Sequence, residues 1–269
     1  MDLGLRGRVA LVSGGSKGIG KAIAEGFARE GAKVALCART EDEVKTTAAT
    51  IAEETGVETL GVRANLTRTE DAEGFVAATV ERFGRIDILV NNAGSARGGV
   101  IEHLSDEDWE QALQLKFLGY VRLIRAVLPT MRRQGGGRVV NLIGNDGIKH
   151  CYWEIAPGAA NAAGQNLTLS LAGQFGRENI TFVAVNPGPV RTERWDGLVR
   201  AMARDMKLSV EEADRLAPRS IPLGRIAEVE EVADLVVFLA SERARFVNGT
   251  MIEIDGGQQK PLMDALRDG

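Results

Sequence analysis

Side chains that could transfer protons are concentrated in one short stretch of the chain. Between Gly144 and Pro157 the sequence carries Asp146, Lys149, His150, Cys151, Tyr152 and Glu154. Imidazole and phenol groups are common general acids and bases, which makes His150 and Tyr152 the candidate proton donors. The alternative is an ordinary polar loop, because loops are rich in such side chains.

A lysine interrupts an otherwise apolar helix face. With about 3.6 residues per turn, one stripe of the helix predicted over residues 106–131 contains Trp109, Leu113, Lys116, Tyr120, Ile124 and Val127. A desolvated lysine can titrate near neutrality and act as an acid or a base. The alternative is that the stem of Lys116 packs at a helix interface while its charge reaches solvent.

A glycine-rich turn indicates a second kind of chemistry. It joins the first predicted strand to the first predicted helix and reads Ser13-Gly14-Gly15-Ser16-Lys17-Gly18-Ile19-Gly20. Glycines let backbone amides approach a pyrophosphate, and a helix N-terminus adds partial positive charge. The turn therefore predicts dinucleotide binding by Gly14, Ser16, Lys17, Gly18, Ile19 and Gly20.

The elements that would hold these residues alternate between strands and helices. Short apolar runs predict strands at residues 8–14, 33–39, 58–64, 86–93, 137–144, 180–187 and 249–255. Continuous apolar runs suit a parallel sheet covered on both faces, and the alternation implies right-handed crossovers. We predict an α/β fold of the Rossmann type, with one doubly wound, parallel, seven-stranded sheet in a single domain over residues 1–269.

The longest connection between predicted strands, residues 190–223, has helical character. Its Ser209 and Glu212 form an N-terminal capping pattern, as Ser105 and Asp108 do at an earlier helix. Long connections are usually functional, so we predict a helical lid over a substrate pocket. A surface insertion that packs on its own body is the alternative. Three residues of this segment suggest a partly apolar substrate: Trp195, Met202 and Met206.

Composition excludes several classes of function. The 269-residue chain has a formal net charge of −4, so it lacks the basic footprint of a nucleic-acid or membrane-surface protein. Its two cysteines, Cys37 and Cys151, are too few for a disulfide framework and suit a reducing compartment. The apolar run at residues 9–12 is too short for a signal peptide or a membrane span, so a cytoplasmic location is expected.

Four motifs in order make the chain resemble the short-chain dehydrogenase/reductase family. The glycine turn is similar to the family's T-G-x-x-x-G-x-G, with Ser13 in the place of Thr. The others are Asn91-Asn92-Ala93-Gly94, Asn186-Pro187-Gly188-Pro189-Val190-Arg191-Thr192 and Asp255-Gly256-Gly257. The resemblance extends over nearly the whole chain. It implies a nicotinamide cofactor held additionally by Asn65, Leu66, Asn92, Ala93, Gly94, Pro187, Gly188, Val190 and Thr192.

Charge at the end of the second strand indicates which cofactor binds. NAD sites place an acid there for the ribose hydroxyls, whereas cations favour the 2′-phosphate of NADP. The strand ends at Arg39 without an acid, and Lys17 lies in the glycine turn, which favours NADP(H) over NAD(H). The alternative is that both are solvated surface charges. Asn65 stands where relatives have an Asp that contacts adenine, and its side-chain oxygen could still accept a hydrogen bond.

The resemblance also implies a catalytic Ser, Tyr, Lys and Asn, and this sequence has different residues in all four places. Aligned without gaps, the Ser position holds Gly144, the Tyr position Pro157 and the Lys position Asn161. The Asn position, on the preceding long helix, holds Lys116. Lysine and asparagine have thus exchanged places, and we hypothesise that Lys116 supplies the cation near the nicotinamide ribose. Pro157 fits the first turn of a helix, where the missing N–H costs nothing.

Two functions from different classes follow. The first is an NADP(H)-dependent oxidoreductase for a carbonyl or alcohol substrate, with a non-standard proton-transfer site that draws on Lys116, Asn161, Tyr152 or His150. The second is a catalytically silent member that acts as a cofactor-binding sensor or a non-catalytic subunit beside an active relative. Lyase chemistry at Lys116 is a minor third. Relatives imply a homodimer or homotetramer, and no metal site is predicted.

Overall fold

The computed structural model describes residues 1–95 and 97–260 and contains one sheet of seven parallel strands. The strands are β1 (Val9–Ser13), β2 (Lys33–Ala38), β3 (Thr59–Arg63), β4 (Ile88–Asn91), β5 (Gly137–Leu142), β6 (Ile180–Pro187) and β7 (Thr250–Ile254). Their order across the sheet is β3-β2-β1-β4-β5-β6-β7. Strands β2 and β3 thus extend the sheet on one side of β1, and β4 to β7 extend it on the other side. The predicted doubly wound fold and all seven predicted strands are confirmed.

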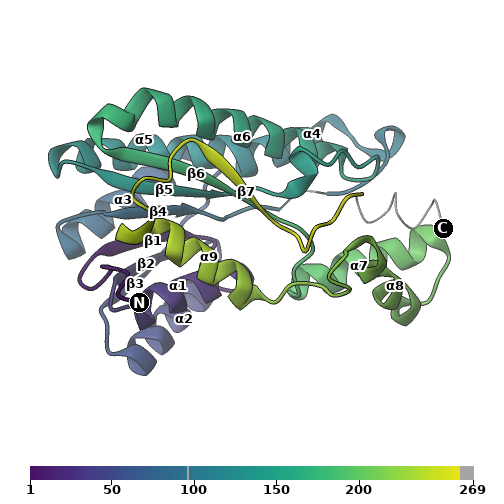
Figure 1. Cartoon of the computed structure of the whole chain (residues 1–269), viewed down its shortest axis with the longest axis horizontal. Helices are drawn as coiled ribbons and strands as arrows, with labels where there is room; N and C mark the ends of the chain where they lie inside the picture. Colours follow the sequence, from purple (N-terminus) through teal and green to yellow (C-terminus); the bar gives the residue numbers. More distant parts are fainter. Residues whose placement is uncertain (96, 261–269) are drawn as a thin grey trace.

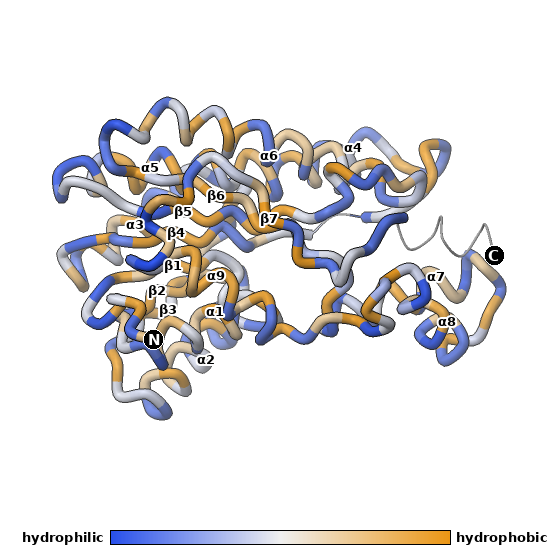
Figure 2. Tube along the Cα trace, viewed as in Figure 1, coloured by the Kyte–Doolittle hydropathy of each residue, from blue (hydrophilic) through white to orange (hydrophobic). Residues whose placement is uncertain are grey.

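Helices cover both faces of the sheet (Figure 1). One face packs against α1 (Gly18–Arg29), α2 (Glu41–Thr55) and α9 (Val229–Ala240), in a core that includes Phe27 and Ile51. The other packs against α3 (Thr69–Phe83), α5 (Gly119–Arg133) and α6 (Ile155–Phe175), around Phe75 and Phe182. Burial on both faces explains why the strands are continuously apolar, and Figure 2 shows this hydrophobic centre.

The helix that carries Lys116 is interrupted at that residue. An α-helix, α4 (Asp106–Leu113), runs into a π-helical turn over residues 114–118 and then into α5. A π turn inserts extra backbone and shifts the helical phase, and such turns occur frequently at functional sites. The predicted apolar stripe is therefore wrong at Leu113, which is 37% exposed, whereas Lys116 is buried. The predicted capping box of Ser105 with Asp108 is confirmed.

The segment after β6 forms two helices, α7 (Glu193–Met206) and α8 (Val210–Leu216), which lie beside the main body in Figure 1. They have a small core of their own that includes Trp195 and Met202, and Trp153 from the loop before α6 joins it. Ser209 accepts a hydrogen bond from the backbone of Glu212, as the capping pattern predicts. In the described part of the chain, no helix is long and apolar enough to cross a membrane.

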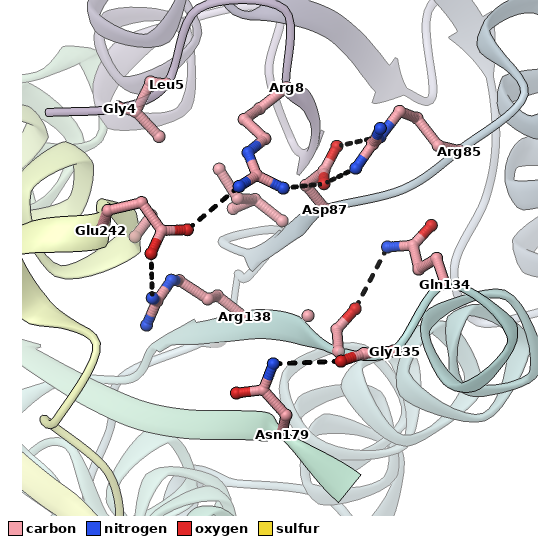
Figure 3. A pocket seen from close by; sticks show the side chains of 14 residues that line it. Gly4, Leu5, Arg8, Arg85, Asp87, Gln134, Gly135, Arg138, Asn179 and Glu242 are labelled. Carbon is pink, nitrogen blue, oxygen red and sulfur yellow. Dashed lines mark hydrogen bonds and ion pairs between the residues drawn. The ribbon is translucent and has the colours of Figure 1, made fainter.

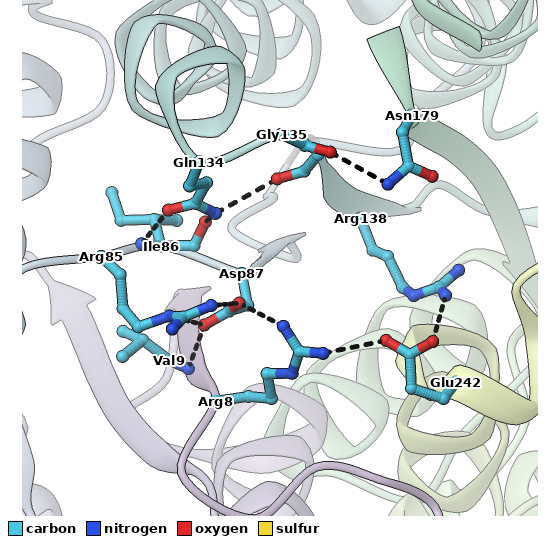
Figure 4. A network of polar contacts seen from close by, with 11 residues as sticks. Arg8, Val9, Arg85, Ile86, Asp87, Gln134, Gly135, Arg138, Asn179 and Glu242 are labelled. Carbon is cyan, nitrogen blue, oxygen red and sulfur yellow. Dashed lines mark hydrogen bonds and ion pairs between the residues drawn. The ribbon is translucent and has the colours of Figure 1, made fainter. Parts of the chain in front are cut away.

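The amino ends of the strands surround a cavity of about 180 Å³ (Figure 3). Figure 4 shows the charged groups there paired with one another. Asp87 accepts hydrogen bonds from Arg85 at 2.6 and 2.8 Å and from Arg8 at 2.9 Å. Glu242 contacts Arg8 at 3.2 Å and Arg138 at 3.5 Å. These contacts link the starts of β1, β4 and β5 to the chain after α9.

Candidate functional site

A much larger cleft, with a volume of about 700 Å³, lies at the carboxyl ends of the strands. It spans the point between β1 and β4 where the strand order reverses, which is where ligands bind in such sheets. The sequence-predicted residues that line it are Gly14, Ser16, Lys17, Gly18, Ile19, Gly20, Arg39, Leu66, Asn92, Ala93, Gly94, Lys116, Gly144, Asn161, Pro187, Gly188, Val190 and Thr192. The structure thus brings nearly all of them to one place.

The glycine turn leaves its backbone amides accessible to a ligand. Gly14 has φ +64°, and a Cβ at Gly20 would overlap the carbonyl oxygen of Gly14. Asn92 braces the turn by donating to the backbone oxygens of Ser13 at 2.9 Å and Gly14 at 3.1 Å. Lys17, at the N-cap of α1, makes no capping hydrogen bond with its side chain. Free amides at a helix N-terminus fit the pyrophosphate of a dinucleotide.

Cations and one carboxylate gather at the end of the cleft beside β2. Arg39 is exposed and makes no ion pair within the described residues, whereas Lys17 lies 3.3 Å from Glu193 of α7. Glu43, in the first turn of α2, also lines the cleft and has no place in the sequence motifs. Asn65 does not line it, and its side-chain oxygen accepts hydrogen bonds from Thr67 instead.

Lys116 is a buried cation in the wall of the cleft. Its side chain is packed along Gly94, where an added Cβ would lie 3.3 Å from Cγ of the lysine. Burial lowers the pKa of Lys116 to about 8; the Asp146 carboxylate opposes this effect and the Arg194 guanidinium adds to it. A lysine with this pKa exchanges its proton near neutrality, which supports the prediction that it is not a passive surface charge.

Glu154 is a second titratable group in the same wall. It occupies the N-cap position of α6 without a capping hydrogen bond from its side chain, and its backbone is held by a bridge to Gly99. Burial raises the pKa of its carboxyl, and the nearby Asp146 raises it further, against the lowering effects of Arg194 and Lys116. The sequence places Glu154 among several polar loop residues, and no motif distinguishes it from them.

The chain is similar to known oxidoreductases over nearly its whole length. The family model described as Enoyl-(Acyl carrier protein) reductase matches residues 14–259. A 3-oxoacyl-(acyl-carrier-protein) reductase of Aquifex aeolicus is 33% identical over 257 residues, which cover 96% of this chain and 99% of that protein. The trans-4-hydroxycyclohexanecarboxylate dehydrogenase of Sinomonas cyclohexanicum is 34% identical over 256 residues, 93% of this chain and 92% of that protein.

Solved structures agree with these relatives. The crystal structure of L-sorbose reductase from Gluconobacter frateurii, complexed with NADPH and L-sorbose, has a TM-score of 0.91 at 35% identity. The match covers 97% of this chain and 100% of that one. This chain belongs to the short-chain dehydrogenase/reductase family.

In this short-chain dehydrogenase/reductase, Gly144 leaves room for a polar pair. Asn161, on α6, donates a hydrogen bond from Nδ2 to Oδ1 of Asp146. A Cβ at Gly144 would lie 2.6 Å from both of those atoms, and the φ of Gly144 is +153°. The amide and carboxylate therefore fill the space that a side chain at 144 would need. Pro157 lies in the first turn of α6, as predicted.

The two sequence-predicted proton donors lie differently from Lys116. His150 is exposed and Tyr152 is 37% exposed, and neither lines the cleft. Their loop is fixed at both ends: Lys149 forms an ion pair with Asp255 after β7, and Trp153 donates to Asp205 of α7 at 2.9 Å. The structure does not bring His150 and Tyr152 together with Lys116, so among these groups the cleft geometry favours Glu154.

The start of α7 closes the cleft opposite the glycine turn. Thr192 caps α7 by accepting from the backbone of Trp195, and a Cβ at Gly18 would lie 3.5 Å from Cγ2 of Thr192. Leu198 and Trp195 also line the cleft and give it an apolar side. Within residues 1–95 and 97–260, no cluster of three or more His, Cys, Asp or Glu could hold a metal ion.

Proposed function

We propose that this chain is an NADP(H)-dependent oxidoreductase that interconverts a small, partly apolar carbonyl compound and its alcohol through a non-standard proton-transfer site. The observation that carries the proposal is the position of two titratable groups, the buried Lys116 and the half-buried Glu154, in the wall of the cleft that begins at the glycine turn. An NADPH-bound reductase among the structural relatives supports the choice of cofactor.

The cofactor fits the residues that are present. The glycine turn and the N-terminus of α1 would hold the pyrophosphate, and Arg39 with Lys17 would face the 2′-phosphate. Asn92, Gly94 and the segment from Pro187 to Thr192 would surround the nicotinamide half. The bound cofactor supplies or accepts a hydride at the carbonyl carbon. The remaining need is a proton at the carbonyl oxygen.

The protein's own residues would manage that proton. In reduction, the Lys116 ammonium or the Glu154 carboxylic acid gives its proton to the oxygen, and solvent replaces it. Gly144, Pro157 and Asn161 stand where the family's Ser, Tyr and Lys are expected, so none of those three groups is available at these places. The Asp146 carboxylate, held by Asn161, would stabilise the charged form of Lys116.

The segment at residues 190–223 would act as a lid over the substrate. Its first turn reaches the glycine turn through the ion pair of Lys17 with Glu193, so cofactor binding would order the lid. The names of the relatives describe chemically different substrates, so the substrate class must be argued from the residues of this cleft. Assembly as a homodimer or homotetramer and a cytoplasmic location remain predictions.

An NADPH-oxidation screen on varied ketones and aldehydes tests the proposal, together with NADPH binding measured by fluorescence. We expect the wild-type protein to turn over. Glu154→Gln and Lys116→Met should each reduce turnover about 100-fold or more, since a general acid contributes about 10²–10⁴-fold to the rate. Their NADPH affinity should stay within about threefold of the wild-type value. The matched controls Tyr152→Phe and His150→Gln should retain activity. NADPH binding without any turnover would instead support a catalytically silent member.

A further inference from the structure

We propose that Arg194 binds an anionic group of the substrate, so that the preferred substrate of this site is a carboxylate-bearing ketone or alcohol. The inference rests on the proposed function and adds a substrate class to it. Arg194 occupies the first turn of α7 and lines the cleft beside Trp195 and Leu198. Its charge acts on Lys116 and Glu154 in the same lining, which puts the guanidinium within reach of a substrate bound there.

Arg194 differs from the charged residues next to it. Arg191 contacts Asp214 at 3.3 Å, and Glu193 contacts Lys17 at 3.3 Å. Arg194 forms no ion pair anywhere in residues 1–95 and 97–260, although it is exposed and lies in the same first turn as the acidic Glu193 and Asp196. A planar guanidinium with five donors matches a carboxylate in a two-point contact. An arginine without a partner in a ligand cleft is therefore suited to an anionic ligand.

The charge of Arg194 is coupled to groups in the wall of the cleft, including the two proposed proton donors. Its charge acts on Lys116 in the π-helical turn, on Tyr120 of α5 and on Glu154 at the start of α6. Two cations, Lys116 and Arg194, thus line the same cleft and repel one another. Asp146 and Glu154 are the nearby carboxyls, and burial holds Glu154 toward its neutral form. A substrate carboxylate would remove this repulsion.

The same arrangement would prepare the site for proton transfer. An anion bound at Arg194 favours the protonated forms of Lys116 and Glu154, because negative charge stabilises a nearby ammonium and disfavours a nearby carboxylate. Substrate binding would then be accompanied by uptake of a proton from solvent. Only the protonated forms can donate a proton to a carbonyl oxygen. Binding of a carboxylate-bearing ketone would therefore favour the protonation state that its own reduction requires.

Binding of non-reacting probes tests the inference without turnover. Cyclohexanecarboxylate and the neutral cyclohexanecarboxamide would be titrated calorimetrically into the wild-type protein saturated with NADPH, into Arg194→Gln and into Arg200→Gln. Arg200 is also exposed on α7 but does not line the cleft, which makes it the matched control. We expect the acid to bind at least tenfold more tightly than the amide to the wild type and to Arg200→Gln, and this preference to vanish in Arg194→Gln.

Two further measurements separate the alternatives. Acid binding near pH 8 should consume protons when measured in buffers of different ionisation enthalpy, and NADPH affinity should be equal in wild type and Arg194→Gln. No preference for the acid in the wild type, a preference that survives Arg194→Gln, or a loss of NADPH affinity in that variant would each overturn the inference. Failure to oxidise NADPH with 4-oxocyclohexanecarboxylate despite acid-selective binding would contradict the proposed reduction and leave the carboxylate site supported.

Discussion

Replacing Lys116 by methionine should make the protein more stable and less active. Lys116 is 7% exposed, and burial lowers its pKa to about 8 from the ordinary 10.5. A difference of about 2.5 pKa units corresponds to about 3 kcal/mol of cost for the charged form, at about 1.4 kcal/mol per unit. Methionine has a similar shape and no charge, so Lys116→Met should raise the free energy of unfolding at pH 7 by about 3 kcal/mol.

The contribution of Lys116 to the free energy of unfolding should depend on pH. Because the folded-state pKa of Lys116 is below the unfolded value, the folded state binds fewer protons between about pH 8 and 10.5. Wild-type stability should therefore gain a contribution from this lysine as the pH rises through that window, and the cost is fully present below pH 8. Urea unfolding of wild type and Lys116→Met, followed from pH 7 to 10.5, measures both curves.

A surface lysine supplies the matched control. Lys45 is an exposed lysine of α2 with its ammonium beside Glu41, and Lys45→Met should leave the stability nearly unchanged. Equal or lower stability of Lys116→Met at pH 7 would refute the cost assigned to burial. Higher stability with unchanged turnover would support the cost assigned to burial and contradict a role for Lys116 in proton transfer. Wild-type turnover in the reductive direction should also fall as the pH rises through about 8.

Three other substitutions test separate parts of the structure. Arg39→Ala should weaken NADPH binding about tenfold or more and leave NADH binding unchanged, because it removes a charged hydrogen bond to the 2′-phosphate; equal losses for both would contradict the assignment. Gly144→Ser should destabilise the fold by about 2–4 kcal/mol in urea unfolding, through its φ and its overlap with the Asn161 amide, whereas Gly74→Ser, in open space, should be neutral. Asp87→Asn should cost about 1–3 kcal/mol at pH 7. Burial raises the pKa of Asp87, but the hydrogen bonds from Arg85, the Val9 backbone and Arg8 together outweigh it and leave the net pKa below 3.8. The wild-type advantage should therefore disappear as the pH falls through that lowered value.

Local patterns were sufficient for the fold and for the cofactor end of the site. Apolar runs and glycine positions act over a few residues, so strands, the turn after β1 and the capping of α4 could be predicted from neighbours in the sequence. The predicted cofactor residues gather in one cleft because parallel strands end at the same edge. Asn65 is the exception, since Thr67, only two residues away, occupies its side-chain oxygen.

The proton-transfer end depended on contacts that no local pattern contains. Residues 145–154 include several polar side chains, and only the folded chain places Glu154 in the wall of the cleft near Lys116 and leaves Tyr152 outside it. The π turn itself shifted Leu113 to the surface while it kept Lys116 inside.

The sequence by itself determined the doubly wound sheet, the dinucleotide-binding turn and the unusual residues at 116, 144, 157 and 161. Hydrophobic periodicity and glycine spacing encode these features directly. The tertiary structure alone decided which charged groups of the cleft act on the pKa of Lys116, namely Asp146, Arg194 and Glu154. Burial and charge coupling arise between segments that are distant along the chain, and these two effects set the pKa values on which the chemistry depends.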